Sequence, residues 1–303
     1  MNLLILSIAI ALFIILLILV CCKIYYDKKT TICILQTLRP GRIVISMTTS
    51  PKRITEIYRV IESMENQTIK PDLYFINLPR MFKRDGSRFS DIPAFLINDR
   101  IILNSCDDLG PATKIVPTCK DKRIKETDII FSVDDDIHYP PELLELYLKY
   151  HIKYPEFVIS GTSLFPRKNP NRYGDLIECD LLEGFSCVLY KKAWLCDIPS
   201  DIFDKRLVPI YHYLSDDLIL SNYLIMKGIR IMHFSIQNPI VKKIKPLTYG
   251  LQADALHKGA GGLAPTCTEG EHCNFTNYIE TIKFLRKHNS YYLTYMEDDI
   301  KRM

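Results

Sequence analysis

The chain has 303 residues, of which 48% are hydrophobic, so it can bury one large core or two closely joined ones. Its formal net charge is only +4, and no run of Lys or Arg is interleaved with aromatic residues, so the sequence does not indicate nucleic-acid binding. It contains no tandem repeat and no long low-complexity segment, which excludes repeat architectures.

The N-terminus departs from this average composition. Residues 1–22, "MNLLILSIAIALFIILLILVCC", carry no charged side chain and are long enough to cross a bilayer as one helix. A cleaved signal peptide usually has a basic first segment, a shorter apolar core and a small-residue cleavage site, and none of these is present. We therefore predict an uncleaved single-pass anchor (a signal-anchor) at 1–22, followed by a basic and polar stem at 23–40.

The orientation of this anchor is left open by conflicting signals. Lys23, Lys28 and Lys29 follow the apolar run, which by the positive-inside rule favours a cytosolic body. Two acceptor sequons, at 66–68 and 274–276, favour a glycoprotein in the secretory-pathway lumen instead. Eight cysteines lie beyond the membrane edge, an even number that is compatible with disulfides without requiring any.

From residue 41 onward, strand-like runs alternate with helical ones. Runs rich in β-branched residues predict strands at 42–49, 72–79, 128–133, 156–162 and 229–234. Apolar residues at helical spacing predict helices at 50–67, 140–155 and 215–228, and 183–195 is predicted to be a strand that runs into a helix. Ser50 and Pro51 suit the start of the first of these helices. The alternation predicts an α/β domain with a mostly parallel sheet over 41–265, followed by a helical tail over 266–303.

Three consecutive aspartates follow one predicted strand, in "TDIIFSVDDDIHYP" (127–140). Because the carboxyl ends of parallel strands face the ligand crevice, we expect Asp134, Asp135 and Asp136 to lie at a site. In an extended segment Asp134 and Asp136 would share a divalent cation, and Asp135 would face the other way. Carboxylate oxygens favour Mg²⁺ or Mn²⁺. A solvated loop is one alternative, and a haloacid-dehalogenase-type phosphatase is another, although that family expects Thr where His138 stands.

Two acidic motifs follow. In "LLEGFSCVLYKKAW", Glu183-Gly184 indicates either a plain turn or a backbone that approaches another group closely, because glycine has no side chain. Asp216 and Asp217 open a predicted helix, where carboxylates serve as ordinary capping residues. The functional alternative is that one of them is a general base that takes a proton from an acceptor hydroxyl.

A glycine-rich segment, "DALHKGAGGLAP", carries the fourth motif. The imidazole of His257 could bind a divalent metal, and Lys258 could neutralise a diphosphate. The neighbouring glycines would let backbone amides reach phosphate oxygens. A flexible linker with a surface histidine is the alternative.

The order of these motifs resembles that of the GT-A nucleotide-sugar glycosyltransferases, particularly the family-2-like ones. The first β-α-β unit of that family resembles "RIVISMTTSPKRI…SMENQTIKPDLYFINLP". Its metal-binding DxD resembles 134–136, its glycine loop resembles 183–185, its acidic pair resembles 216–217, and its C-terminal histidine resembles His257. The resemblance covers roughly 43–262 and implies a GT-A-like (Rossmann-like) mixed, mostly parallel sheet flanked by helices.

The resemblance also implies a role for each matched residue. Metal binding, with Mn²⁺ or Mg²⁺ as cofactor, would fall to Asp134, Asp136 and His257. Donor binding would fall to Thr48, Thr49, Arg53, Lys114, Asp135, Glu183, Gly184 and Lys258. The catalytic base would be Asp217, or Asp216 beside it.

The implied activity is metal-dependent transfer of a hexose-like sugar from a nucleotide-diphosphate sugar to a hydroxyl of a glycan, protein or lipid, with inversion. Many relatives carry an acidic residue where Asn77 stands, so a UDP-sugar is only the default expectation for the donor. In a retaining enzyme, Asp217 would not be a base. Two other classes stay open: a metal-dependent phosphohydrolase, which releases phosphate without an acceptor, and a non-catalytic membrane-anchored protein that binds sugar or calcium.

Overall fold

A computed structural model describes residues 3–163, 167, 169–204, 206–247, 273–290 and 292–293 of the chain. The chain separates into two compact units, Met1–Arg39 and Pro40–Met303. The first is a single helix, α1 (Leu3–Leu38), and its part Ile10–Leu38 is long and apolar enough, by length and composition, to cross a membrane. The helix covers the predicted anchor and continues through most of the predicted stem.

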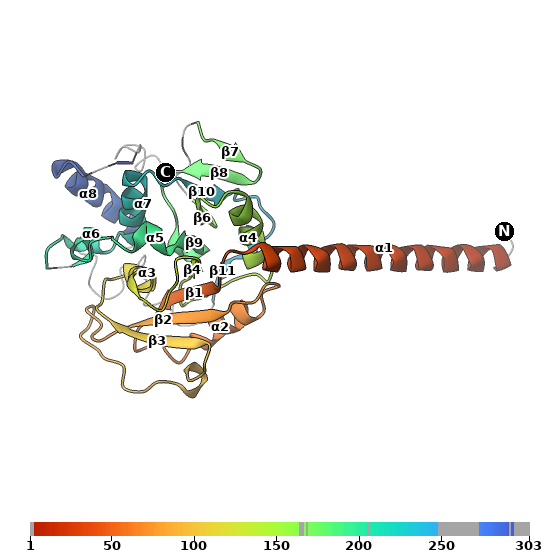
Figure 1. Cartoon of the computed structure of the whole chain (residues 1–303), viewed down its shortest axis with the longest axis horizontal. Helices are drawn as coiled ribbons and strands as arrows, with labels where there is room; N and C mark the ends of the chain where they lie inside the picture. The colour runs from red at the N-terminus through yellow and green to blue at the C-terminus, as the bar shows by residue number, and fades with distance from the viewer. Residues whose placement is uncertain are drawn as a thin grey trace. The chain divides into compact units, whose positions relative to one another are not determined.

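The second unit is built on a nine-stranded sheet with the order β3-β2-β1-β4-β9-β6-β10-β8-β7 (Figure 1). Its strands are β1 (Ile43–Thr48), β2 (Leu73–Pro79), β3 (Ile101–Cys106), β4 (Ile129–Ser132), β6 (Val158–Ser160), β7 (Arg172–Tyr173), β8 (Leu176–Cys179), β9 (Val188–Lys191) and β10 (Ile231–Phe234). Strands β1 to β4, β6 and β10 run in one direction, whereas β9 is antiparallel to both of its neighbours. This arrangement confirms the predicted mixed, mostly parallel α/β sheet.

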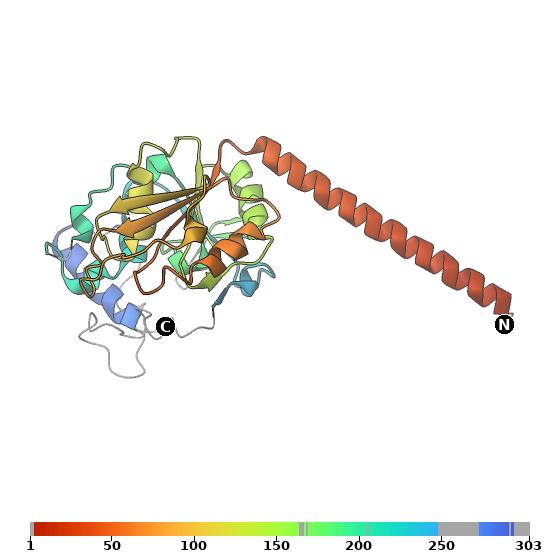
Figure 2. The ribbon, with the colours of Figure 1, turned by 90° about the horizontal axis from the view of Figure 1, so that it is seen from below.

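Helices cover both faces of the sheet, so the central strands are apolar on both sides, as buried parallel strands usually are. On one face α3 (Val116–Lys120), α5 (Lys192–Leu195) and α7 (Asp216–Met226) share a core with the strands. On the other face α4 (Leu143–Lys153) places Tyr147 between Phe131 and Phe234, with ring centroids 5.6 and 5.1 Å away. Both ribbon views show α2 (Tyr58–Glu65) beside α4 and away from α3 (Figures 1 and 2).

The first predicted helix of the body is shorter than the sequence indicates. Residues 51–57 form successive turns, with Arg53 N–H bonded to Ser50 O and Glu56 N–H bonded to Arg53 O, and the helix begins only at Tyr58. Ser50 therefore does not cap a helix. The turns bring the Arg53 side chain to the aspartate triplet, where two carboxylates hold it. Tertiary contacts have thus overridden the local helical pattern.

The structure also adds elements that the sequence pattern did not reveal. Strand β3 is polar at its end, and the hairpin of β7 and β8 is short, so neither shows a clear alternation. A second sheet of two short strands pairs β5 (Ile137–His138) with β11 (Lys245–Pro246). This small sheet joins a late segment of the chain to the residues that directly follow the aspartate triplet.

The predicted C-terminal helix is present as α8 (Cys273–Lys287). Its residues Tyr278, Ile282 and Leu285 form an apolar cluster with Leu181 and Leu218 of the body. The helix therefore packs on the body of the second unit. The eight cysteines whose side chains the structure describes, Cys21, Cys22, Cys33, Cys106, Cys119, Cys179, Cys187 and Cys196, are free thiols, so no disulfide forms among them.

His151 in α4 predicts an acid-sensitive fold. Both ring nitrogens are buried without a hydrogen-bond partner among the described residues, and burial, with Lys191 nearby, lowers the pKa of His151 to about 4. In the unfolded chain this pKa is about 6.5, so between pH 6.5 and pH 4 the unfolded state binds more protons and stability falls as the pH falls. We expect urea unfolding of the full chain in nonionic detergent to lose about 3 kcal/mol through this group across that window.

The variant His151→Phe should reduce this acid limb, since phenylalanine has no proton to gain, and a remainder should persist because burial also lowers the pKa of His212 to about 4. The matched control is His288→Phe, because His288 is exposed. An unchanged acid limb in His151→Phe would show that this buried ring does not cause the loss.

Candidate active site

The strand order places a topological switch point at the ends of β1 and β4. After β1 the chain moves outward to β2 and β3, and it then returns to the other side of β1 as β4, so the segments that follow β1 and β4 diverge at a topological switch point. Thr49, after β1, donates its hydroxyl to Asp135 Oδ2 at 2.7 Å. Arg53 Nη1 lies 2.8 Å from Asp135 Oδ1 and 3.2 Å from Asp136 Oδ2. Thr49, Arg53, Asp135 and Asp136, all expected at the site, therefore meet there.

The three aspartate side chains do not point in the directions that an extended strand would give them. Residues 133–136 leave the strand and enter a turn, and Asp135 and Asp136 share the guanidinium of Arg53. Asp134 instead contacts Lys114. The expectation that Asp134 and Asp136 face one side and Asp135 the other was wrong, because the turn breaks the two-residue period.

Lys114 forms the centre of a second cluster. It ends the short helix η2 (Ala112–Lys114), and its Nζ lies 3.0 Å from Asp134 Oδ1 and 3.4 Å from Asp216 Oδ2. The side chain of Lys114 is buried, and its backbone carbonyl accepts a hydrogen bond from Ser46 Oγ at 2.5 Å. Lys114 therefore connects Asp134, which follows β4, to Asp216, which begins α7.

Gly184 closes the cluster from the opposite side. Its N–H donates to Asp217 Oδ1 at 3.0 Å. A Cβ at this position would lie 2.3 Å from Lys114 Nζ and 2.8 Å from Asp217 Oδ1, so any larger residue would displace the amine or the carboxylate. Of the two alternatives that the sequence left open at Glu183-Gly184, a plain turn or a close approach of the backbone to another group, this geometry supports the second.

The cluster around Lys114 carries more negative than positive charge. Burial alone would lower the pKa of Lys114, but the three surrounding carboxylates outweigh it and hold the pKa well above its ordinary value. Burial raises the pKa of Asp217, and the adjacent Asp216 raises it further, well above the usual range for a carboxyl. The pKa of Asp216 is also raised by burial, although Lys114 opposes the shift. An ionised Asp217 is thus more basic than an exposed aspartate.

The chemistry of the donor set fits a divalent cation. Around Lys114 and Arg53, five carboxylates face two cations, a formal charge of −3 if all are ionised. Burial and the two neighbouring aspartates raise the pKa of Asp136 to about 6. In the described ranges no three His, Cys, Asp or Glu side chains converge closely enough to hold an ion. Carboxylate oxygens are the kind of ligand that Mg²⁺ and Mn²⁺ take, often one or two of them with water and substrate phosphates.

The remaining predicted residues occupy several positions. Thr48 donates its hydroxyl to Asn77 O at 2.8 Å and so bonds to the neighbouring strand. Glu183 is buried and accepts a hydrogen bond from Thr162 Oγ1 at 2.7 Å. The side chain of Asn77 is buried too, bonded to two polar neighbours on adjacent elements. His257 and Lys258 lie outside the described residues.

Two further residues near the site, Tyr139 and Cys187, were not identified from the sequence. The hydroxyl of Tyr139 accepts from Asp134 N–H at 3.0 Å and donates to Phe185 O at 3.0 Å, so it links the triplet to the glycine loop. Cys187 adopts a φ of 71°, a strained value for a residue with a side chain, and its carbonyl accepts from Tyr147 Oη at 2.6 Å. In sequence both residues look like ordinary core positions.

No protein-family model matches the sequence, and no curated protein matches it either. The solved structures that are similar to it have TM-scores below 0.5. S. aureus TarS 1–349 in complex with UDP-GlcNAc has a TM-score of 0.49 at 12% identity, covering 86% of this chain and 70% of that one. S. aureus TarS gives 0.46 at 11% identity, and this chain spans 42% of its length. The Pyrobaculum calidifontis mannosyltransferase PcManGT, in complex with GDP-Man and Mn²⁺, gives 0.42 at 14% identity, covering 63% of this chain and 54% of that one.

Proposed function

We propose that this chain is a metal-dependent glycosyltransferase of the GT-A type that moves a sugar from a nucleotide-diphosphate sugar to a hydroxyl acceptor. One observation carries the proposal. Asp134 and the Gly184–Asp217 hydrogen bond, which come from three distant parts of the sequence, meet around the buried amine of Lys114. They do so beside a switch point of the sheet, where α/β proteins bind nucleotides.

Each side of the site has its own task in this proposal. Asp134 and Asp136 supply oxygen ligands for Mg²⁺ or Mn²⁺, with His257 as a further proposed ligand. The metal, when bound, stabilises the negative charge that develops on the leaving nucleoside diphosphate. Lys114 is the fixed positive charge nearest to Asp134, so it adds to this stabilisation without needing to reorganise.

Asp217 is the residue best suited to act as general base. Asp216 is paired with Lys114, whereas one oxygen of Asp217 is fixed by Gly184 N–H, which orients the carboxylate. Its raised pKa increases its affinity for the proton of an acceptor hydroxyl. Loss of that proton to Asp217 makes the acceptor oxygen nucleophilic toward the anomeric carbon, and the outcome is inversion.

On the other side of the site, Thr49 and Arg53 face the nucleotide. Both are tied to Asp135, so they are held in position before any ligand arrives. We further propose that α1 anchors the chain in a membrane, because Ile10–Leu38 has the necessary length and composition.

A thermal-shift panel of nucleotide sugars tests the donor side directly. With Mn²⁺ present, one nucleotide class at about a hundred times its dissociation constant is expected to stabilise the full chain by about 2.7 kcal/mol. The response should disappear in Asp136→Ala and without the metal. Asp85→Ala is the matched control, because Asp85 is an aspartate of the β2–β3 loop that bonds to Ser87 and Lys52. A folded protein that responds to no nucleotide, or phosphate release without an acceptor, would contradict the transferase assignment.

A further inference from the structure

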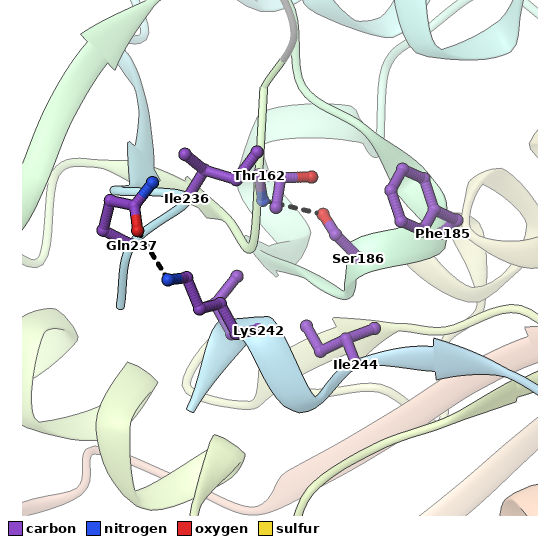
Figure 3. Close-up of a pocket in the computed structure, with 8 residues that line it drawn as sticks. Thr162, Phe185, Ser186, Ile236, Gln237, Lys242 and Ile244 are labelled. Atoms are coloured by element: carbon purple, nitrogen blue, oxygen red, sulfur yellow. Dashed lines mark hydrogen bonds between the residues drawn. The ribbon is translucent and has the colours of Figure 1, made fainter. Parts of the chain in front are cut away.

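A pocket of 430 Å³ is lined by residues that follow β6 and β10 and by residues that directly precede β9 (Figure 3). One wall contains Phe185 and Ser186, which directly follow Gly184 of the site. Thr162, after β6, is joined to that wall through Glu183, whose carboxylate accepts its hydroxyl. The opposite wall comes from the segment that follows β10. The lining residues are Thr162, Phe185, Ser186, Ile236, Gln237, Val241, Lys242 and Ile244.

The polar side chains of the pocket are largely engaged with one another. Ser186 Oγ accepts from Thr162 N–H at 2.9 Å and donates to Glu183 O at 2.7 Å. Gln237 Oε1 accepts from Lys242 Nζ at 2.5 Å, as the dashed line in Figure 3 marks. A sugar ring would need free donors and acceptors for its hydroxyl groups, since a buried polar group that is left unpaired is costly. These side chains therefore do not favour a sugar in the pocket itself.

Apolar groups make up much of the remaining lining. Phe185 is 43% exposed and Ile236 is 61% exposed, although both border a concave surface. With Val241 and Ile244 they supply the apolar part of the pocket lining. The pocket volume falls within the range of about 300 to 1,000 Å³ that small-molecule sites occupy. Covering these apolar groups with an apolar ligand group would remove them from water.

The segment that follows β10 is basic, and Lys242 brings one ammonium group into the pocket lining. Lys243 and Lys245 are exposed on the same segment, and Lys243 forms an ion pair with Glu142 at 3.8 Å. The ammonium group of Lys242 has three donors, and the bond to Gln237 uses one of them, so it can also bind an anion. The segment continues to Leu247, whose N–H donates to the backbone carbonyl of Asp136 at 2.8 Å and so connects this segment to the aspartate triplet.

We propose that this pocket binds an amphiphilic anion, with an apolar chain against Phe185 and Ile236 and a phosphate-like group at Lys242. The inference rests on the proposed transferase function in one respect: it makes such an amphiphile the acceptor class. A pocket that shares the Glu183–Ser186 loop with the site would bring the hydroxyl end of the acceptor toward Asp217.

Hexyl phosphate is the probe, because it is soluble and combines both features. Saturation-transfer NMR would measure its binding to the full chain in zwitterionic nanodiscs, with empty nanodiscs subtracted, and hexanol and inorganic phosphate as comparisons. Hexyl phosphate should bind at least about tenfold more tightly than either comparison. Ile236→Asp should weaken it by about tenfold or more, since it places a charge among the apolar groups of the lining. Lys242→Gln should weaken it by about threefold.

Leu207→Asp is the matched control, because Leu207 is an exposed leucine outside the pocket lining, and it should bind as the unaltered chain does. Equal binding of inorganic phosphate would overturn the apolar part of the inference, and equal binding of hexanol would overturn the anionic part. Unchanged binding in Ile236→Asp would overturn the location. Asp134→Asn separates the two proposals: it should abolish the nucleotide response and leave hexyl phosphate binding intact.

Discussion

Replacing Asp217 with asparagine is expected to reduce sugar transfer by about two to four orders of magnitude, the usual contribution of a general base. The amide keeps the shape that accepts Gly184 N–H but cannot take a proton from the acceptor. The measurement is release of nucleoside diphosphate from the donor found in the nucleotide panel, with membranes as the source of acceptor.

Nucleotide binding and folding should survive in this variant, because it removes one of three crowded carboxylates and leaves Lys114 paired with Asp134. Ser221→Ala is the matched control on the same helix, since its hydroxyl bonds to the Asp217 carbonyl and not to its carboxylate. Full transfer activity in Asp217→Asn would remove this residue from the mechanism and favour a retaining reaction.

The second large effect is expected at Lys114. Lys114→Met keeps most of the side-chain volume but leaves Asp134, Asp216 and Asp217 without their shared cation in a buried place. Breaking a buried ion pair in this way costs about 3 to 5 kcal/mol, so we expect a loss of that size in the free energy of unfolding at pH 7. Urea unfolding of the full chain would measure it.

The pH dependence of this loss has a definite sign. Without the ammonium group, which opposes the raised pKa values of Asp216 and Asp217, those two values rise further, and acid then protonates these carboxylates and relieves their repulsion. The penalty should therefore shrink as the pH falls toward 5. Lys120→Met is the control, because Lys120 is exposed and bonds to Ser200 Oγ. A penalty below about 1 kcal/mol would mean that Lys114 contributes no more than a surface ion pair.

The sequence predicted the sheet well where the strands are apolar on both faces. β1, β2 and β4 lie within one or two residues of their predicted bounds, since nothing competes with burial there. The first helix of the body was predicted too long, because the helical spacing of its apolar residues gives no sign that Arg53 is held by carboxylates 82 and 83 positions later. A contact at that distance in sequence leaves no local pattern.

At the site, too, features that depend on the local sequence pattern could be predicted, and features that depend on distant contacts could not. The positions of the aspartates and of Glu183-Gly184 could be predicted, because each stands at the end of an apolar run. The pairing of each carboxylate with Lys114 or Arg53 could not be predicted, because it depends on the turn after β4. Tyr139 was missed for a simpler reason, namely that a buried tyrosine with a satisfied hydroxyl looks the same in sequence whether or not it supports a site.

The position of β9 has a consequence for how the protein becomes active. This strand is formed by residues 188–191, yet it lies between β4 and β6, which come earlier in the chain. A growing or refolding chain must therefore leave that place open until β9 arrives, and loop closure over such distances is slow. Gly184 precedes β9 and lies against Lys114, so we expect this contact to form only after the insertion. During refolding, nucleotide binding would then be regained only once the sheet is complete, later than the first appearance of secondary structure.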